Sequence, residues 1–279
     1  MQVSHLPHTR RFAEVFLTGA PIARPAQRDS VVDSATFDRP CGTDLRTLAS
    51  ALAVWYTRNM SSSTLTSTTS SSILTPKRAG IAAVVLLAVL AVLVLLSPAE
   101  AQLGNLIKII YLHGALARVG IYAILLAGVL GLVYLIRPRA ALLRWSNGVQ
   151  VAGLIAFVTH FALSVIPTHE TWGMWIAFDE PRTQMSLQII GVGIIVVLVR
   201  RLVNDDRLSG LANALLGIAV LLLNLRTGVL RHPLNAIGDS TSTAIQGFYF
   251  GIVLACAALV ALLAWYLTYR AASSPTSSS

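Results

Sequence analysis

Charged residues are scarce in this chain, and their scarcity excludes a soluble fold. Only 12% of the 279 residues are Asp, Glu, Lys or Arg, whereas 55% are hydrophobic. Soluble domains carry about 25% charged residues. Most residues of this chain must therefore contact lipid or one another, which indicates a multi-pass protein of the cell membrane.

Cysteine is also nearly absent. The chain has two cysteines, Cys41 and Cys256, and no CxxC sequence. This excludes a disulfide framework, a zinc site built from several thiolates and the CxxCH sequence that attaches c-type haem covalently. A Walker-type phosphate loop, an HExxH pair and a GxSxG elbow are absent as well, so no signature of those enzyme classes is present.

Long apolar runs are what the chain has in abundance. Six of them approach the ~20 residues that a helix needs to cross the hydrocarbon core of a bilayer. They cover residues 79–97, 112–136, 148–166, 183–199, 208–225 and 243–269. We therefore predict an all-α membrane protein in which residues 76–270 form a bundle of six transmembrane helices.

The first run has a second interpretation. Lys77 and Arg78, the apolar run and Ala99-Glu100-Ala101 also match a secretory signal with a small-residue cleavage site. The uncharged run is longer than the ~7–15 residues of a signal core, which favours retention. Cleavage would leave five spans in the same orientation.

Basic residues are distributed unequally between the two ends of the spans. If the spans alternate in direction, one side receives Lys77, Arg78, Arg137, Arg139, Arg144, Arg200, Arg201, Arg207 and Arg270. The positive-inside rule predicts that this side, with both chain termini, is cytoplasmic. The net charge of +9 then reflects topology and the arginine-rich N-terminus, and it does not indicate a nucleic-acid partner.

The two ends of the chain differ from the spans. Residues 1–75 are predicted to be a poorly ordered extension, because 1–59 are arginine-rich without a sustained apolar period and 61–72 are rich in Ser and Thr. Such a tract cannot bury enough apolar surface to offset its chain entropy. Met60 is a candidate for the true start, and residues 271–279 are predicted to be a disordered tail.

An aromatic run joins the third and fourth spans on the predicted external side. Its sequence is Trp172-Gly173-Met174-Trp175-Ile176-Ala177-Phe178-Asp179. Flat rings at the water boundary of a membrane bundle suit a flat apolar ligand. They equally suit an interfacial aromatic belt that only anchors helices, so the run alone leaves both interpretations open.

Histidines are placed near the same boundary. His113 begins the second span, His232 lies in the external loop between the fifth and sixth spans, and His169 precedes Trp172 by three residues, whereas His160 lies deep in the third span. Neutral imidazole is a common axial ligand of haem iron. Two histidines from different external loops can therefore ligate one haem, although each can equally be a hydrogen-bonded interfacial residue.

Arg118 lies inside the second span, where an ionisable residue is costly and is often functional. It is offset from His113 by about 140° on a helix. Its guanidinium can meet an anionic group such as a haem propionate or extend toward the interface.

Several short motifs follow one another along the chain: Pro98-Ala99-Glu100, Gly104-Asn105, Ile109-Ile110-Tyr111-Leu112-His113, Trp172-Gly173-x-Trp175-x-x-Phe178-Asp179, Asn204-Asp205-Asp206-Arg207-Leu208-x-Gly210 and Asn224-Leu225. In this order they resemble the CcmC-type haem proteins of cytochrome c maturation. The resemblance covers residues 79–269 and leaves 1–75 unexplained. It implies six transmembrane helices and an external tryptophan-rich motif that presents haem to a membrane-tethered periplasmic chaperone (CcmE-type), alongside an ABC transporter.

The resemblance also implies roles for particular residues. His113 matches the first haem-ligating histidine, and the external motif matches at Trp172, Gly173, Trp175 and Asp179. Together with Phe178 and Arg118 these residues are predicted to bind a non-covalent b-type haem. The implied activity is haem presentation, similar to that of a haem lyase, without a catalytic residue.

The chain departs from the family pattern in its external loops. Ile176 and Phe178 stand where the family usually has Trp. The family's second haem-ligating histidine falls near Asp239, whereas this chain has His232 seven residues earlier. We therefore predict His113 and His232 as the iron ligands, with His169 as the alternative to His232.

Two other functions stay open. A transporter or permease subunit for haem or another hydrophobic substrate would have Gly- or Pro-broken helices in corresponding halves, and this chain has only scattered Gly. A membrane oxidoreductase with intramembrane b-type haem would need paired histidines at matched depth, and His160 alone lies clearly inside a span.

Overall fold

The computed structural model describes residues 74–231, 237 and 240–273. In these residues the chain is helical, and the one bridge of β type, between Glu100 and Gly104, is isolated. The helices are α2 (Pro76–Leu96), α3 (Ile107–Ile136), α4 (Ala140–Trp172), α5 (Pro181–Val203), α6 (Asp206–Arg226) and α7 (Thr243–Ser273). All six are long and apolar enough to cross a membrane. The prediction of an all-α, multi-pass bundle of six spans is confirmed.

The predicted N-terminal extension, with Met60, lies outside the described residues up to residue 73, and so does the predicted tail from residue 274. Residues 271–273 belong to α7, which ends at Ser273. His232 and Asp239 are also outside the described part of the chain.

Helices α2 and α6 begin at polar capping residues outside the apolar runs. Thr75 caps α2 by accepting the backbone N–H of Arg78, with Pro76 as the first helical residue. The carboxylate of Asp205 accepts the N–H of Leu208 at 2.6 Å and starts α6. Helix α4 extends well past both ends of the predicted span at 148–166 and ends only at Trp172. A cap satisfies the backbone groups that a helix end leaves unpaired, whatever the hydropathy of the last turn.

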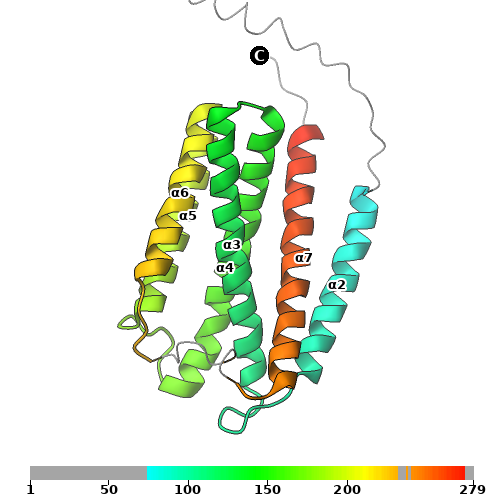
Figure 1. Cartoon of the computed structure of the whole chain (residues 1–279), viewed down its shortest axis with the longest axis vertical. Helices are drawn as coiled ribbons and strands as arrows, with labels where there is room; N and C mark the ends of the chain where they lie inside the picture. The colour runs from blue at the N-terminus through cyan, green and yellow to red at the C-terminus, as the bar shows by residue number, and fades with distance from the viewer. Residues whose placement is uncertain (1–73, 232–236, 238–239, 274–279) are drawn as a thin grey trace, which may run out of the picture. The chain divides into compact units, whose positions relative to one another are not determined.

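Successive helices run in opposite directions (Figure 1). The connections α2–α3, α4–α5 and α6–α7 therefore lie together at what we call the loop end of the bundle. The connections α3–α4 and α5–α6 lie at the other end, with the start of α2 and the end of α7. This second end carries most of the arginines and is called the arginine-rich end.

Helix α3 occupies the middle of the bundle. It packs most extensively against α4 and α6 and also contacts α7 and α2, whereas α5 lies against α6 and α4. Small residues line these contacts. A Cβ placed on Gly128 of α3 would lie 2.9 Å from the Cα of Gly217 of α6, and one on Gly131 would lie 2.6 Å from the carbonyl oxygen of Gly210. Such close approach strengthens van der Waals contact between helices in lipid.

A buried polar network joins four helices toward the arginine-rich end. Arg200 of α5 donates to the side-chain oxygens of Gln150 of α4 and Asn213 of α6, each at 2.9 Å. Asn213 donates to the hydroxyl of Ser146 at 2.8 Å, and that hydroxyl donates to the carbonyl of Ala127 of α3 at 2.8 Å. The sequence placed Arg200 in a cytoplasmic turn, whereas the structure places it inside α5 with its guanidinium turned into the bundle. Interhelical hydrogen bonds of this kind add to packing in a membrane protein.

The first prediction concerns the α3–α6 contact. Replacing Gly128 by Ala should lower the free energy of unfolding by about 1–3 kcal/mol, because the new methyl group would overlap the backbone of Gly217. Thermal unfolding of the detergent-solubilised protein, followed by circular dichroism, measures the change. Gly191→Ala on α5 is the matched control, since a Cβ there meets nothing within 4 Å. Equal melting temperatures for the two variants would contradict the prediction.

Candidate functional site

The aromatic run forms the connection between α4 and α5 at the loop end. Helix α4 ends at Trp172, and Gly173 follows with φ 70° and donates its N–H to the carbonyl of His169. A left-handed backbone at this position favours glycine, because the Cβ of any other residue would crowd the backbone carbonyl oxygen. The side chains beyond the turn alternate: Trp175 and Phe178 are 63% and 64% exposed, whereas Ala177 is fully buried. The rings of Trp175 and Phe178 therefore face outward, and the buried Ala177 between them anchors the loop.

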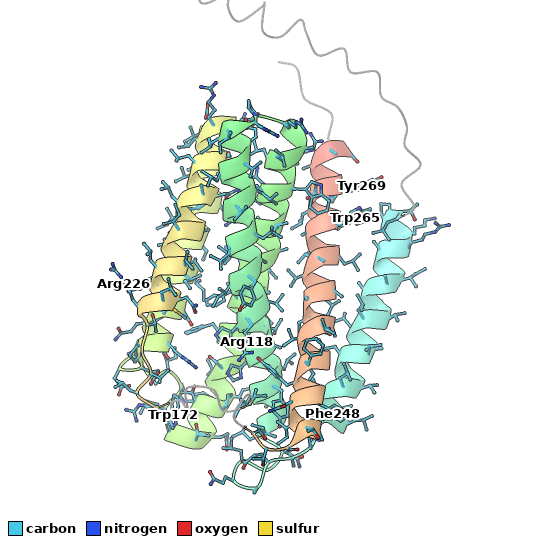
Figure 2. All side chains as sticks on the ribbon, viewed as in Figure 1. Arg118, Trp172, Arg226, Phe248, Trp265 and Tyr269 are labelled. Atoms are coloured by element: carbon cyan, nitrogen blue, oxygen red, sulfur yellow. The ribbon has the colours of Figure 1, made fainter. Side chains whose placement is uncertain are left out.

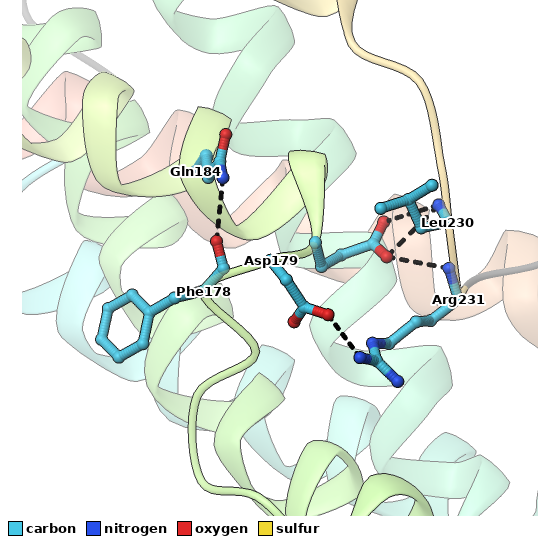
Figure 3. A network of polar contacts seen from close by, with 6 residues as sticks. Phe178, Asp179, Gln184, Leu230 and Arg231 are labelled. Carbon is cyan, nitrogen blue, oxygen red and sulfur yellow. Dashed lines mark hydrogen bonds and ion pairs between the residues drawn. The ribbon is translucent and has the colours of Figure 1, made fainter. Parts of the chain in front are cut away.

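A buried carboxylate fastens this loop to the next one. Glu180 immediately precedes α5 and is fully buried. Its carboxylate accepts the backbone N–H of Arg231 at 2.8 Å and that of Leu230 at 3.3 Å (Figure 3). A buried carboxylate needs such donors to offset its lost hydration. The segment that follows α6 is thus held against the start of α5.

Arg231 joins the same two loops through its side chain. Its guanidinium donates to the carboxylate of Asp179 (Figure 3). The same guanidinium lies 5.9 Å from the centre of the Trp172 ring. The donated hydrogen bond lowers the pKa of Asp179 below its ordinary value, and the guanidinium charge acts in the same direction. Asp179 is therefore an ionised residue that orients Arg231 over Trp172.

His169 lies in the last turn of α4, beside the aromatic run. Its ring stacks on Trp175, with ring centroids 4.0 Å apart and planes 22° from parallel. Its Nδ1 lies 3.4 Å from the carboxylate of Glu170. The alternative ligand of the sequence prediction thus contacts the motif directly.

His113 lies near the loop end of α3, and its Nδ1 is 3.1 Å from the carbonyl oxygen of Ile109. His160 of α4 approaches from the other side, with its Nδ1 2.9 Å from the carbonyl oxygen of His113. The two imidazole rings are stacked, with centroids 5.4 Å apart and planes 18° from parallel. The ring of Phe157 lies beside that of His160, with ring centroids 5.2 Å apart. The structure therefore brings together two histidines that the sequence analysis had treated separately.

This geometry can be tested against a haem group. When Nδ1 donates to a carbonyl, Nε2 carries the lone pair that binds iron, and a hydrogen bond of this kind is usual for metal-ligating histidines. His113 meets that condition. His160 stacks face to face on His113 and directs its own Nδ1 at the His113 carbonyl, so it would support His113 rather than hold a haem together with it. His169 or His232 would then be the further residue that holds the group.

Arg118 lies on α3, as the sequence predicts, and its side chain contacts a different helix from the one that His113 contacts. Its side chain is exposed, and its guanidinium lies 5.2 Å from the centre of the Tyr249 ring of α7. His113, in contrast, contacts α4 through His160. Arg118 (labelled in Figure 2) is therefore directed at α7, whereas His113 is directed at α4.

Sequence reasoning assigned no role to Glu180, Arg231 or His160. An acid directly after the aromatic run and an arginine directly before His232 were visible as charges in external loops. Their pairing joins segments about fifty residues apart, and only the packing of α5 beside α6 brings them together. The signal available for His160 was that it is an ionisable residue inside a span.

The second prediction follows from the Asp179–Arg231 pair. Because the pKa of Asp179 is lowered, the pair contributes stability above the ordinary carboxyl pKa and loses it as the pH falls through the lowered value. Arg231→Gln should raise the pKa of Asp179 back toward its ordinary 3.8. A ¹³C NMR titration of the Asp carboxyl carbons, assigned with Asp179→Asn, measures this. Arg226→Gln, at the end of α6, is the control, and an unchanged titration in Arg231→Gln would refute the pairing.

Known proteins do not place this chain in a family. No protein-family model matches the sequence, and no curated protein matches it. The likeness to CcmC-type proteins therefore rests on the order of the short motifs in the sequence. What the structure adds is a membrane-spanning bundle with aromatic rings exposed at one end.

Proposed function

We propose that this chain is a membrane haem-binding protein that presents a non-covalent b-type haem at the loop end of the bundle. One observation carries the proposal: His113, near the start of α3, and the exposed Trp175 and Phe178, between α4 and α5, belong to the same end of the bundle, with Nδ1 of His113 directed at the Ile109 carbonyl. A surface site for haem needs a ligating imidazole and flat apolar surface for the macrocycle. Both are present here.

Each residue of the site has a definite task in this proposal. His113 would hold the haem through its imidazole, and the haem, when bound, would supply redox-active iron and the vinyl groups that a recipient uses. His160 fixes the backbone carbonyl and the ring plane of His113. Trp175, stacked on His169, and Phe178 provide the apolar surface. Asp179 and Arg231 keep Trp172 and its loop in position.

His232 is the favoured second ligand. It directly follows Arg231, whose backbone N–H is held by Glu180 and whose side chain is held by Asp179. The chain is therefore fixed to the aromatic run up to the residue before His232. His169 is the alternative, since it already contacts Trp175.

The exposed rings also support a role in transfer. A haem held at the loop end would be accessible to a protein outside the membrane, such as the CcmE-type chaperone that the resemblance implies. ABC transporter subunits of the same maturation system would then be further partners. The proposal includes no conventional catalytic group. The proposed activity is presentation of the haem, which the chain holds and orients.

Orientation of the bundle is the third prediction. The arginines at the arginine-rich end favour the cytoplasmic side for that end, so the aromatic run faces outward. A reporter inserted after Arg139 or Asn204 should read as cytoplasmic, and one inserted after Gly173 as external. External labelling at Arg139 would place the aromatic run in the cytoplasm and remove the basis for presentation to an external chaperone.

The fourth prediction concerns haem binding itself. The purified chain, reconstituted with haem, should show a Soret band that His113→Ala abolishes or shifts. Replacing Trp172 and Trp175 by Ala should weaken haem retention roughly tenfold, since each aromatic contact contributes about 0.5–1.5 kcal/mol and about 1.4 kcal/mol is tenfold in affinity. Absorbance titration of haem measures both effects.

Matched variants locate the second ligand. Trp265→Ala, in the half of α7 toward the arginine-rich end (Figure 2), should retain haem as the unchanged chain does. His232→Ala should alter the Soret band if His232 is the second ligand, and His169→Ala if His169 is. His160→Phe keeps a ring beside His113 and should shift the band without abolishing it. Unaltered spectra in His113→Ala, His169→Ala and His232→Ala would overturn the haem proposal.

A further inference from the structure

A groove lies between α3 and α7, away from the face of α3 that carries His113. It has a volume of about 530 Å³, and its lining includes Arg118 and Tyr122 of α3 with Tyr249, Phe250 and Val253 of α7. We call it the Arg118 groove. Tyr122 and Phe250 are 67% and 63% exposed, so in a bilayer the groove opens to lipid.

Among the described residues that line the groove, Arg118 alone carries a formal charge, and that charge is positive. The ion pairs found in the described part of the chain are His169 with Glu170 and Arg231 with Asp179. Arg118 instead lies over the ring of Tyr249 at 5.2 Å, and the described residues that line the groove include no carboxylate. The guanidinium is therefore balanced by the face of an aromatic ring, which offsets only part of its charge.

The position of Arg118 along α3 makes this arrangement costly in a bare bilayer. Helix α3 has 30 residues and is about 45 Å long, against a hydrocarbon core of about 30 Å. Arg118 lies about 16 Å along the helix from Ile107, which is inside the core if α3 is centred in it. A guanidinium facing lipid at that depth is unfavourable unless water or an anion comes to meet it.

The lining of the groove changes character along its length. Gln246, near the start of α7, lies at the loop end, Arg118 and Tyr249 come next, and Tyr122 and Val253 lie deeper toward the middle of the bundle. Polar groups thus lie toward the interface and apolar groups toward the bilayer centre. That order matches a molecule with an anionic head and a hydrocarbon tail.

We propose that the Arg118 groove binds an anionic phospholipid of the surrounding bilayer. The phosphate accepts hydrogen bonds from the Arg118 guanidinium, whose planar donors suit a phosphate oxygen pair. One acyl chain lies along Tyr122, Phe250 and Val253. The bilayer onto which the groove opens is itself the source of this ligand, and the uncompensated cation selects the anionic lipids from it.

Native mass spectrometry of the detergent-solubilised full chain, titrated with phosphatidylglycerol or phosphatidylcholine, tests the proposal. The unchanged protein should retain phosphatidylglycerol preferentially. Arg118→Gln should reduce that retention about tenfold, to the level of phosphatidylcholine, whereas Arg118→Lys should keep part of it. Arg226→Gln is the matched control, because Arg226 is also exposed near the loop end but lies on α6, outside the groove (Figure 2).

A second variant separates lipid binding from folding. Val253→Trp keeps Arg118 but fills the apolar part of the groove, so it should also reduce phosphatidylglycerol retention, and circular dichroism checks that both variants stay helical. Retention of phosphatidylglycerol by folded Arg118→Gln would overturn the proposal. The proposal would also be overturned if Arg118→Gln bound lipid as the unchanged chain does but retained haem more weakly. That result would assign Arg118 to a haem propionate. Loss of lipid preference with an unchanged haem titration would support it.

Discussion

The architecture depends on how closely α3 can approach its neighbours. Between helices in lipid there is little hydrophobic driving force, because acyl chains are as apolar as Leu side chains, so contact area and hydrogen bonds have to hold the bundle together. Gly128 and Gly131 allow the backbone of α3 to approach that of α6, and Gly120 does the same toward α4. The positions of His113 on α3 and His160 on α4 follow from that approach, since their stacking requires adjacent helices at short range.

Polar contacts are concentrated at both ends of the described bundle, with different consequences. Toward the arginine-rich end, Arg200, Gln150, Asn213 and Ser146 cross-link helices and involve buried side chains. At the loop end, Glu180 and Asp179 join loops to one another and leave Trp175 and Phe178 exposed. One end is therefore built for rigidity inside the bundle, and the other holds an exposed aromatic surface in a fixed place.

The sequence predicted the number of spans and their order, because length and hydropathy are properties of each segment alone. It placed the ends of α4 poorly, since Ala140 to Asn147 and Pro167 to Trp172 contain polar residues that a helix accepts outside the hydrocarbon core. It placed the aromatic run in a loop, which holds for the exposed Trp175 and Phe178, whereas Trp172 is the half-buried last residue of α4. The sequence did not predict contacts between helices. The rotation of α4 turns His160 toward His113, and the rotation of α5 turns Arg200 inward. Both rotations depend on packing with other segments.

The link between Glu180 and the segment after α6 acts on backbone N–H groups of residues 230 and 231. Nearly every residue type supplies such a group, so the side chains at these two positions can change while the carboxylate keeps its donors. Proline is the exception, because it has no N–H to donate. The loop that leads toward His232 is thus free to vary its surface chemistry, including its affinity for a partner, without losing its attachment to the start of α5.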